Sequence, residues 1–286
     1  QNALLTLKSG ITCVRDLGSN NDATIVLSTA VEKGYIMGPR IISSGRSIIM
    51  TGGHDPFWGI QADGPAELLK TVRHQVQKGA KVIKISATGG VYGRQEGEDV
   101  GTPELNRDEI EVVCEEAHKF GLKVAAHAIS EEGIRNCIEA GVDTIEHGHF
   151  LTETAMQMMR EKNIHWIPTL YVYRQIAEGE NLPEYAVRKA NRIIEVHQQA
   201  FEQGIKLSVP IAAGSDAGSP NTPHGSLLSE LEYMNGYGYS LHETLKSATI
   251  NAAHVLGLQD TIGSLEVGKK ADILIIGEDP SKDTSA

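Results

Sequence analysis

The chain has 286 residues, 40% of them hydrophobic, and a formal net charge of −11. Its length suits a single α/β barrel with an appendage, and its apolar share is large enough for a sizeable core, which excludes a disordered chain. The acidic balance, without a run of Lys or Arg, opposes binding to nucleic acid and to anionic membranes, so we expect a small-molecule or dipeptide substrate.

The cysteines and the N-terminal residues bear on the cellular setting. Three cysteines without CxxC spacing predict neither a disulfide framework nor a thiolate zinc site, and Cys13, Cys114 and Cys137 read as small core residues. No apolar stretch approaches the roughly 20 residues of a membrane span, and no basic segment of a signal peptide leads the chain. These features predict a cytoplasmic location.

Short apolar runs alternate with amphipathic segments along the chain, which is typical of parallel strands buried on both faces. Helices that end at a glycine are predicted at residues 107–120, 130–140 and 182–203. Seven strands are predicted at residues 11–15, 40–44, 81–86, 122–127, 142–147, 165–170 and 210–216. The pattern favours an α/β fold of the (β/α)8 TIM-like barrel type over a doubly wound open sheet, because no glycine fingerprint follows the first strand.

The predicted barrel covers residues 1–260 and holds seven of its eight strands. Residues 3–9 read as a helix that should follow a first strand, and that strand is missing from the predicted set. Seven strands leave an edge of the barrel unpaired, and this edge leads us to expect a homo-oligomer. Residues 261–286 predict a partial β appendage, with a turn at 263–268 and a strand at 271–276.

Polar residues end or interrupt four of the predicted strands: Lys84, His127, His147 and Asp216. The C-terminal strand ends of such barrels hold their chemistry. A single strand-end histidine reads as a satisfied core residue, but two imidazoles and a carboxylate on nearby strands suit zinc or a similar divalent ion. A lysine inside a buried strand must be neutralised, paired or chemically altered. Together these residues predict a metal site.

The runs around these residues resemble the amidohydrolase superfamily. They read Val-Ile-Lys-Ile-Ser-Ala-Thr-Gly-Gly-Val at 82–91, Val-Ala-Ala-His-Ala at 124–128, Thr-Ile-Glu-His-Gly at 144–148 and Ala-Gly-Ser-Asp-Ala-Gly at 213–218. They are similar to the imidazolonepropionase-like branch, which includes prolidase-like and Xaa-Arg carboxypeptidase-like metal-dependent hydrolases. The resemblance extends to residues 249–257 and 268–272, and so spans nearly the whole chain.

The resemblance implies two divalent metal ions, expected to be zinc, bridged by a carbamylated Lys84. It implies that His127 and His147 bind one metal. Asp216 would contact the other metal and accept the proton of the bridging water, which makes it a catalytic residue.

The family pattern also begins with a His-x-His pair at the end of the first strand, and no such pair precedes Ile11. His147-Gly-His149 has that spacing on another strand, so His149 reads as a neighbour of the site and not as a substitute for the pair.

Several other residues are candidates for contact with the substrate. His54 follows the third strand of the complete barrel, where the resembling enzymes place a substrate-facing histidine, although a structural hydrogen bond would also explain it. Tyr173 resembles a family tyrosine that donates to the carbonyl or tetrahedral oxygen, with Tyr171 as an offset competitor. Arg174 could pair with a substrate carboxylate or with a surface acid. The remaining candidates are Gly89, Gly90 and Val91, which form a turn open to close approach, and His224 on the loop after Asp216.

Other polar residues are expected to have no part in the site. His74, His118, His197, His242 and His254 fall within helical patterns and read as solvated or packing residues. The acidic residues 96–99 read as an exposed loop face.

The expected function is hydrolysis of an amide or peptide bond, in a dipeptide or an N-acyl amino acid, by a metal-activated water. Asp216 would return the proton to the leaving nitrogen, and Tyr173 or His54 would steady the oxyanion. Two alternatives stay open. The same metal chemistry could act on a lactone, carbamate, arylurea or phosphotriester. The chain could also be an incomplete, non-catalytic module, because it lacks the first-strand ligands.

Overall fold

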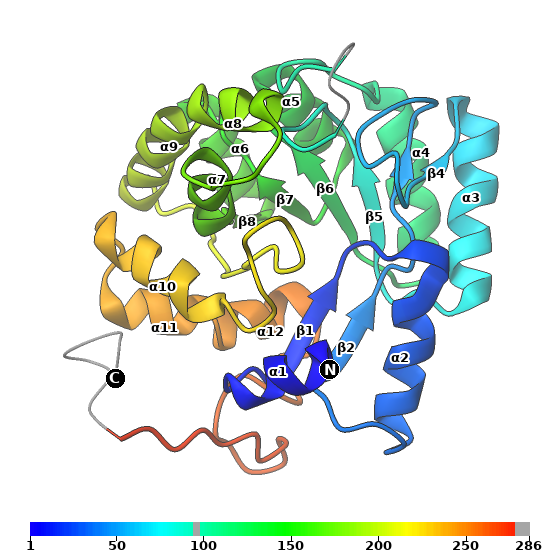
Figure 1. The fold of residues 1–286 in the computed structure, drawn as a ribbon. Coiled ribbons are helices and arrows are strands. Elements are labelled where there is room, and N and C mark those ends of the chain that lie inside the picture. Colours follow the sequence, from blue (N-terminus) through cyan, green and yellow to red (C-terminus); the bar gives the residue numbers. More distant parts are fainter. Residues whose placement is uncertain (94–97, 278–286) are drawn as a thin grey trace.

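Parallel strands form the inner layer of the molecule and helices form its outer layer (Figure 1). The structure is a computed structural model that describes residues 1–93 and 98–277. Its strands are β1 (Cys13–Asp16), β2 (Arg40–Ser43), β3 (Ile48–Ile49), β4 (Ile60–Gln61), β5 (Ile83–Ser86), β6 (Val124–Ala128), β7 (Thr144–His147) and β8 (His165–Ile167). Its helices are α1 (Asn2–Lys8), α2 (Ala23–Glu32), α3 (Gly64–Lys78), α4 (Arg107–Lys119), α5 (Glu131–Ala140), α6 (Glu153–Lys162), α7 (Leu170–Ala177), α8 (Glu184–Asn191), α9 (Ile194–Lys206), α10 (Leu227–Gly236), α11 (Leu241–Ser247) and α12 (Ile250–Leu256), with a 3-10 turn at Asn20–Asp22.

The strands follow one another around the barrel. β1 pairs with β2, and a second sheet has the order β4-β3-β5-β6-β7-β8, with parallel pairing throughout. The backbone joins the two sheets, because Lys81 N–H, just before β5, donates to the Ser43 carbonyl at the end of β2 (2.8 Å). β3 continues in the direction of β2 and pairs with β5. The predicted parallel α/β fold is confirmed.

The seventh predicted strand, residues 210–216, is present only as a short bridge. Trp166 N–H donates to the Pro210 carbonyl (2.8 Å) and Ala212 N–H donates to the Trp166 carbonyl (3.0 Å), after which Ala213 N–H turns to Ser247 (3.0 Å). Pro210 has no N–H to donate, and among the described residues no strand pairs with the far edge of this segment. The strand prediction was therefore too long.

The predicted helices at 107–120 and 130–140 are confirmed as α4 and α5. Asn106 and Glu109 form a capping box at the start of α4, and the Ser130 hydroxyl accepts from Gly133 N–H at the start of α5. The single helix predicted at 182–203 is instead the pair α8 and α9, because the backbone at Ile193 (φ −121°) leaves the helical range.

Alternation along the strands sends apolar side chains outward and polar ones inward. Ile83 and Ile85 pack against the surrounding helices, each contributing about 1.5–3 kcal/mol of burial, and Lys84 between them faces the interior. On β7, Ile145 joins the same apolar layer, whereas Thr144 and Glu146 bind Arg15 of β1. The barrel interior beneath the strand ends is therefore polar.

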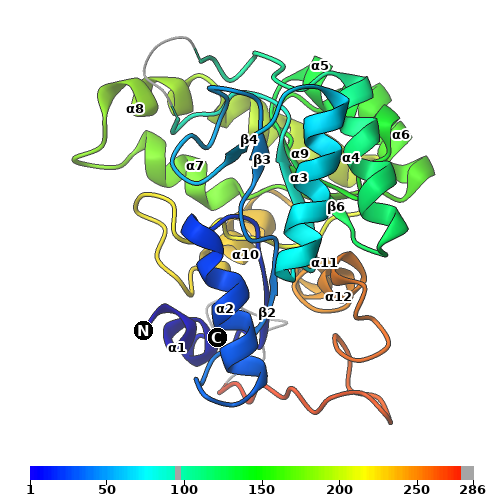
Figure 2. The ribbon, with the colours of Figure 1, turned by 90° about the vertical axis from the view of Figure 1, so that its right-hand side faces the viewer.

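Residues 271–277 lie beside the N-terminal helix α1 (Figures 1 and 2). Asp272 forms an ion pair with Arg40 (3.3 Å), but residues 271–276 are exposed and have no strand assignment. The β appendage therefore stays a prediction, and residues 278–286 lie outside the described part of the chain. Within that described part, no helix combines the length and apolar character needed to cross a membrane.

Candidate active site

Three histidines from separate loops and strands meet at the C-terminal strand ends. His54 follows β3, His127 lies in β6 and His147 ends β7. The His54 and His127 rings stack with centroids 4.3 Å apart, and the His147 ring meets His127 edge-on at 4.7 Å. All three residues are at most 7% exposed. Residues far apart in the sequence thus form one buried imidazole cluster.

His127 and His147 each have one ring nitrogen fixed by a hydrogen bond. His147 Nδ1 lies 2.7 Å from Thr169 Oγ1, and because that hydroxyl donates to the Pro168 carbonyl, Nδ1 is the donor to it. His127 Nε2 donates to the Gly89 carbonyl (3.2 Å). Burial, reinforced by neighbouring positive groups, holds the pKa of both imidazoles well below their usual range. Each is therefore a neutral ring with its other nitrogen available, as in metal-bound histidines.

Lys84 lies beside this cluster and is 6% exposed. Burial lowers the pKa of its ammonium group, and the carboxylates of Glu146, Asp55 and Asp216 oppose that shift. Glu146 pairs with Arg15 (2.8 Å) and Asp55 accepts from Ser86 (3.0 Å). Among the described residues, Lys84 Nζ makes no hydrogen bond or ion pair.

Asp216 follows the short strand segment and is near enough to Lys84 for each to affect the pKa of the other. Its Oδ2 accepts a hydrogen bond from Ser219 (3.0 Å). Asp216 (φ 51°), Thr169 (φ 52°) and His147 (φ 72°) all have left-handed backbones at neighbouring strand ends. Such strain in residues other than glycine is uncommon and is concentrated at functional sites.

The turn after β5 is held against His54 by Glu98. One Glu98 oxygen accepts from both His54 Nδ1 and Gly90 N–H, each at 2.8 Å. A Cβ on Gly90 would lie 2.2 Å from His54 Cε1, so only glycine fits there. Burial lowers the pKa of His54, but the carboxylates of Asp55 and Glu98 more than compensate and the pKa is raised.

The expectation that residues 96–99 form an exposed face is wrong for Glu98. Its side chain is buried, because an acceptor is needed there for the His54 ring and the Gly90 N–H. Residue 96 lies outside the described residues.

Tyr173 lies on α7, and the strand predicted at residues 165–170 is shorter than expected. β8 stops at Ile167, because Glu230 accepts from the Leu170 and Tyr171 N–H groups (2.9 and 2.8 Å) and thereby starts a helix. The Tyr173 ring stands edge-on to His147, with centroids 5.4 Å apart. Tyr171 instead contacts Tyr233, so Tyr173 is the tyrosine beside the imidazole cluster.

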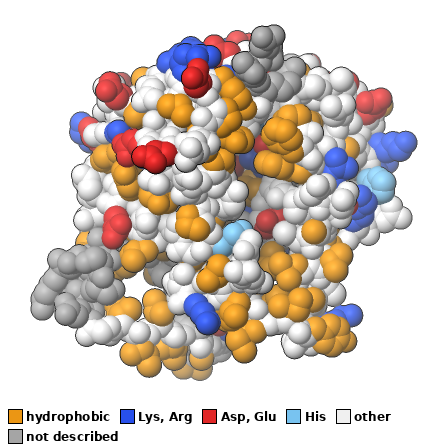
Figure 3. All heavy atoms as spheres, viewed as in Figure 1, with side chains coloured by type: hydrophobic (Ala, Val, Ile, Leu, Met, Phe, Trp, Pro, Cys, Tyr) orange, Lys and Arg blue, Asp and Glu red, His pale blue; other side chains and the backbone are white. Residues whose placement is uncertain are grey.

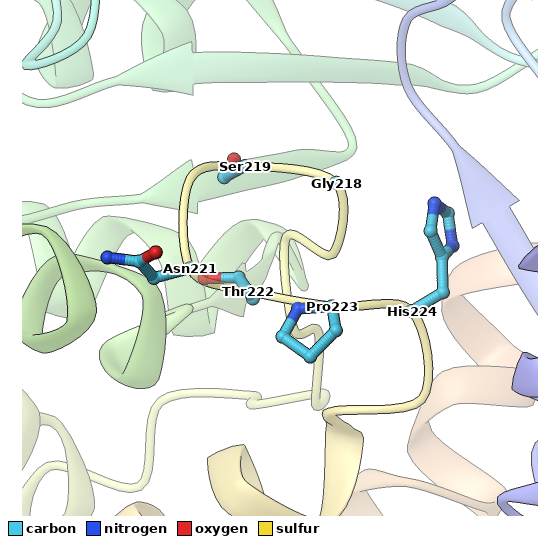
Figure 4. A pocket seen from close by; sticks show the side chains of 6 residues that line it. All are labelled: Gly218, Ser219, Asn221, Thr222, Pro223 and His224. Atoms are coloured by element: carbon cyan, nitrogen blue, oxygen red, sulfur yellow. The ribbon is translucent and has the colours of Figure 1, made fainter. Parts of the chain in front are cut away.

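The other substrate candidates differ in their surroundings. Val91 is buried in one apolar cluster with Tyr173. Arg174 donates to Tyr237 Oη (3.2 Å) and Gln198 Oε1 (3.1 Å), on the side of α9 and α10. His224 borders an open pocket of about 400 Å³ in the loop after Asp216, opposite Asn221 (Figure 4). Figure 3 shows this side of the molecule hollowed near its centre, where histidine and acidic side chains reach the surface.

Two further histidines lie behind the cluster: His149, which the sequence predicted as a neighbour of the site, and His197, which it did not. His149 is fully buried, and neither of its ring nitrogens has a hydrogen-bond partner among the described residues. Its ring lies 3.8 Å from that of His197. His197 Nε2 donates to the His147 carbonyl (2.9 Å), and burial lowers the His197 pKa to about 3. In the sequence, His197 lies within a helical pattern, and nothing in that pattern indicates this contact.

The donor chemistry fits a divalent metal, although the ligand set is incomplete. The three imidazoles are in contact, but within residues 1–93 and 98–277 no group of three His, Cys, Asp or Glu side chains is arranged so that it could hold a metal ion. The neutral nitrogens of His127 and His147 and the adjacent Lys84 are nevertheless donors of the kind that such metals bind once the lysine carries an anionic group.

The fold has parallel strands inside and helices outside, and its buried histidine cluster lies at the C-terminal strand ends. This is the arrangement of an α/β-barrel enzyme. The model of the amidohydrolase family matches residues 2–285, and the chain belongs to that family. The predicted superfamily and barrel fold are therefore confirmed.

Solved structures and curated relatives agree with this assignment. The chain is similar to a Xaa-Pro dipeptidase whose crystal structure contains bound methionine. The two sequences are 34% identical, and the structures align with a TM-score of 0.93 over 100% of this chain and 74% of that chain. A putative prolidase from Bifidobacterium longum is 32% identical, with a TM-score of 0.88 over 99% of this chain and 71% of that one. Ochratoxinase from Aspergillus niger is 30% identical over 97% of this chain, which spans only 62% of that relative's length.

Proposed function

We propose that the protein is a metal-dependent hydrolase that cleaves the amide or peptide bond of a dipeptide or an N-acyl amino acid. Membership of the amidohydrolase family and similarity to a Xaa-Pro dipeptidase and an ochratoxinase support hydrolysis of such a bond. The observation that carries the proposal is the pair of neutral imidazoles, His127 and His147, beside the buried Lys84.

In this proposal His127 and His147 would hold one divalent ion and Asp216 a second, with zinc as the expected metal. Lys84, as a carbamate, would be the shared anionic ligand: its neutral amine nitrogen would form a bond to the carbon of carbon dioxide as one C=O π bond breaks, and would release one proton to solvent. The lowered Lys84 pKa supports this step, because only the unprotonated amine can attack. Bound metal would supply Lewis-acid polarisation of the scissile carbonyl and an activated water.

The residues of the chain supply proton transfer and orientation. Asp216 takes a proton from the attacking water and delivers it to the leaving nitrogen. Tyr173 or His54 donates a hydrogen bond to the developing oxyanion, since His54 belongs to the imidazole cluster and Tyr173 borders it. Gly89, Gly90 and Val91, in the buried turn beside His54, border the substrate in this proposal, and His224 contacts it from the opposite loop. For Arg174 to bind a substrate carboxylate it would first have to exchange its contacts with Tyr237 and Gln198.

A substrate panel on the zinc-loaded protein, with bicarbonate present, tests this proposal. The panel contains dipeptides and N-acyl amino acids, together with a lactone, a carbamate, an arylurea and a phosphotriester. We expect hydrolysis of an amide that stops on chelation and is abolished in Asp216→Asn with the fold intact. Turnover of an ester-type substrate alone would overturn the bond assignment. No turnover and no bound metal would favour the non-catalytic module.

A further inference from the structure

The backbone carbonyl of His147 accepts hydrogen bonds from two buried aromatic side chains. Trp166 Nε1, on β8, donates to it at 2.8 Å, and His197 Nε2, on α9, donates at 2.9 Å. Trp166 is 0% exposed and His197 is 2% exposed. A carbonyl oxygen has two lone pairs, so these two donors saturate it.

This double contact coincides with a reversal of direction in β7. Thr144 and Glu146 face the barrel interior and Ile145 faces the helices, so a regular strand would send His147 outward with Ile145. The left-handed backbone of His147 (φ 72°) breaks this alternation, and its ring instead lies 4.7 Å from that of His127. For a residue other than glycine this conformation costs on the order of 1–3 kcal/mol, and surrounding contacts must maintain it.

The ring of His147 is fixed independently of its backbone. Its Nδ1 donates to Thr169 Oγ1, which leaves Nε2 as the free nitrogen. Gly148 N–H, next along the chain, donates to the Ala128 and Glu146 carbonyls (3.1 and 3.0 Å), so the turn that follows is also tied to β6 and β7. Trp166 and His197 donate to the carbonyl of the peptide bond between His147 and Gly148. This carbonyl lies between the fixed His147 ring and the fixed Gly148 N–H.

We infer that His197 and Trp166 are positioning residues, which hold the strained backbone of His147 so that its free ring nitrogen faces the metal site. The consequence for metal binding rests on the proposed function, whereas the hold on the backbone does not. A residue that only filled space would be replaceable by a ring of similar size without a donor. A positioning residue would not.

Metal affinity separates these two roles. His197→Phe keeps a ring against His149 and removes the N–H, whereas His197→Gln keeps a donor. Phe201→Leu is the matched control, because Phe201 lies one turn along α9, packs on the same Trp166 and donates nothing. Titration with Co²⁺ should show roughly 10- to 100-fold weaker binding in His197→Phe, as is typical when a contact behind a metal ligand is lost. The Gln variant should recover most of this affinity, and the Phe201 control should lower Tm alone.

Amide exchange of the metal-free protein provides a second readout that does not depend on metal. NMR should show faster exchange of the Gly148 amide in His197→Phe and in Trp166→Phe than in wild type, with no such local change in Phe201→Leu. If wild type binds no Co²⁺, the metal part of the proposed function fails, and the Gly148 exchange rates still decide the inference. Wild-type metal affinity together with unchanged Gly148 exchange in both variants would overturn it.

Discussion

The guanidinium of Arg15 on β1 reaches across the barrel interior to the carboxylate of Glu146 on β7, with Nη2 and Oε1 2.8 Å apart. The same guanidinium donates to Thr144 Oγ1 (3.1 Å), and both charged side chains are less than a tenth exposed. The pair joins opposite sides of the open barrel. Burial lowers the Lys84 pKa, and Glu146 is the carboxylate that opposes this shift most strongly. Arg15 is bonded to that same carboxylate.

Arg15→Met should destabilise the fold by about 3–5 kcal/mol, because it leaves the buried Glu146 charge without its partner. The free energy of unfolding in urea measures this effect. The double variant Arg15→Met, Glu146→Leu should recover much of the loss, since it removes both charges. A single variant as stable as wild type would show that the pair does not hold the two strands together.

Gly90→Ala should reduce turnover sharply, because its Cβ would lie 2.2 Å from His54 Cε1 and must displace that ring. We expect a stability loss of about 1–3 kcal/mol from the overpacking. Gly101→Ala, in the same loop, is the control, since nothing lies within 4 Å of the added methyl group. Equal kcat/KM for the two variants would mean that the position of His54 does not matter to the reaction.

His149→Phe should leave stability unchanged or raise it by up to about 1–3 kcal/mol, because the variant removes two buried nitrogens that have no partner among the described residues. Thermal unfolding of the metal-free protein measures this change. His197→Phe should do the opposite, since its N–H is bonded. If His149→Phe instead lost stability or metal, His149 would have a polar role that its contacts do not explain.

Stability should fall as pH rises from about 4.5 to about 7 because of Glu230, whose pKa burial raises from 4.5 to about 7. The folded protein then holds this proton more tightly than the unfolded chain, so the stabilisation is complete below the unfolded pKa and is lost as pH rises through the folded pKa. The effect is on the order of 3 kcal/mol for a fully buried group. The stability advantage of wild type over Glu230→Gln, from urea unfolding across this range, should shrink with pH, and a constant difference would contradict the prediction.

Local patterns predicted the parts of the molecule that local interactions determine. The spacing of apolar residues and the closing glycines predicted α4 and α5, and the apolar runs predicted the strands that carry Lys84, His127 and His147. These strands are buried on both faces, so each polar residue within them stands out in the sequence.

Contacts between distant residues determined the rest. Glu98 is buried because it binds His54, 44 positions away, and His197 binds the His147 carbonyl across 50 positions. Tyr173 is helical because Glu230, from α10, accepts the first N–H groups of α7. No periodicity in one sequence indicates such pairings, so the sequence predicts a surface position for Glu98 and a packing role for His197.

The most direct test of the proposed function is the rate of dipeptide hydrolysis measured against zinc bound per chain, with zinc determined by elemental analysis on the same samples. The rate should rise with zinc up to two ions per chain and return to zero on chelation. Asp216→Asn should retain zinc at the histidine site without turnover. A rate that stays the same with and without zinc would show that the protein is not a metal-dependent hydrolase.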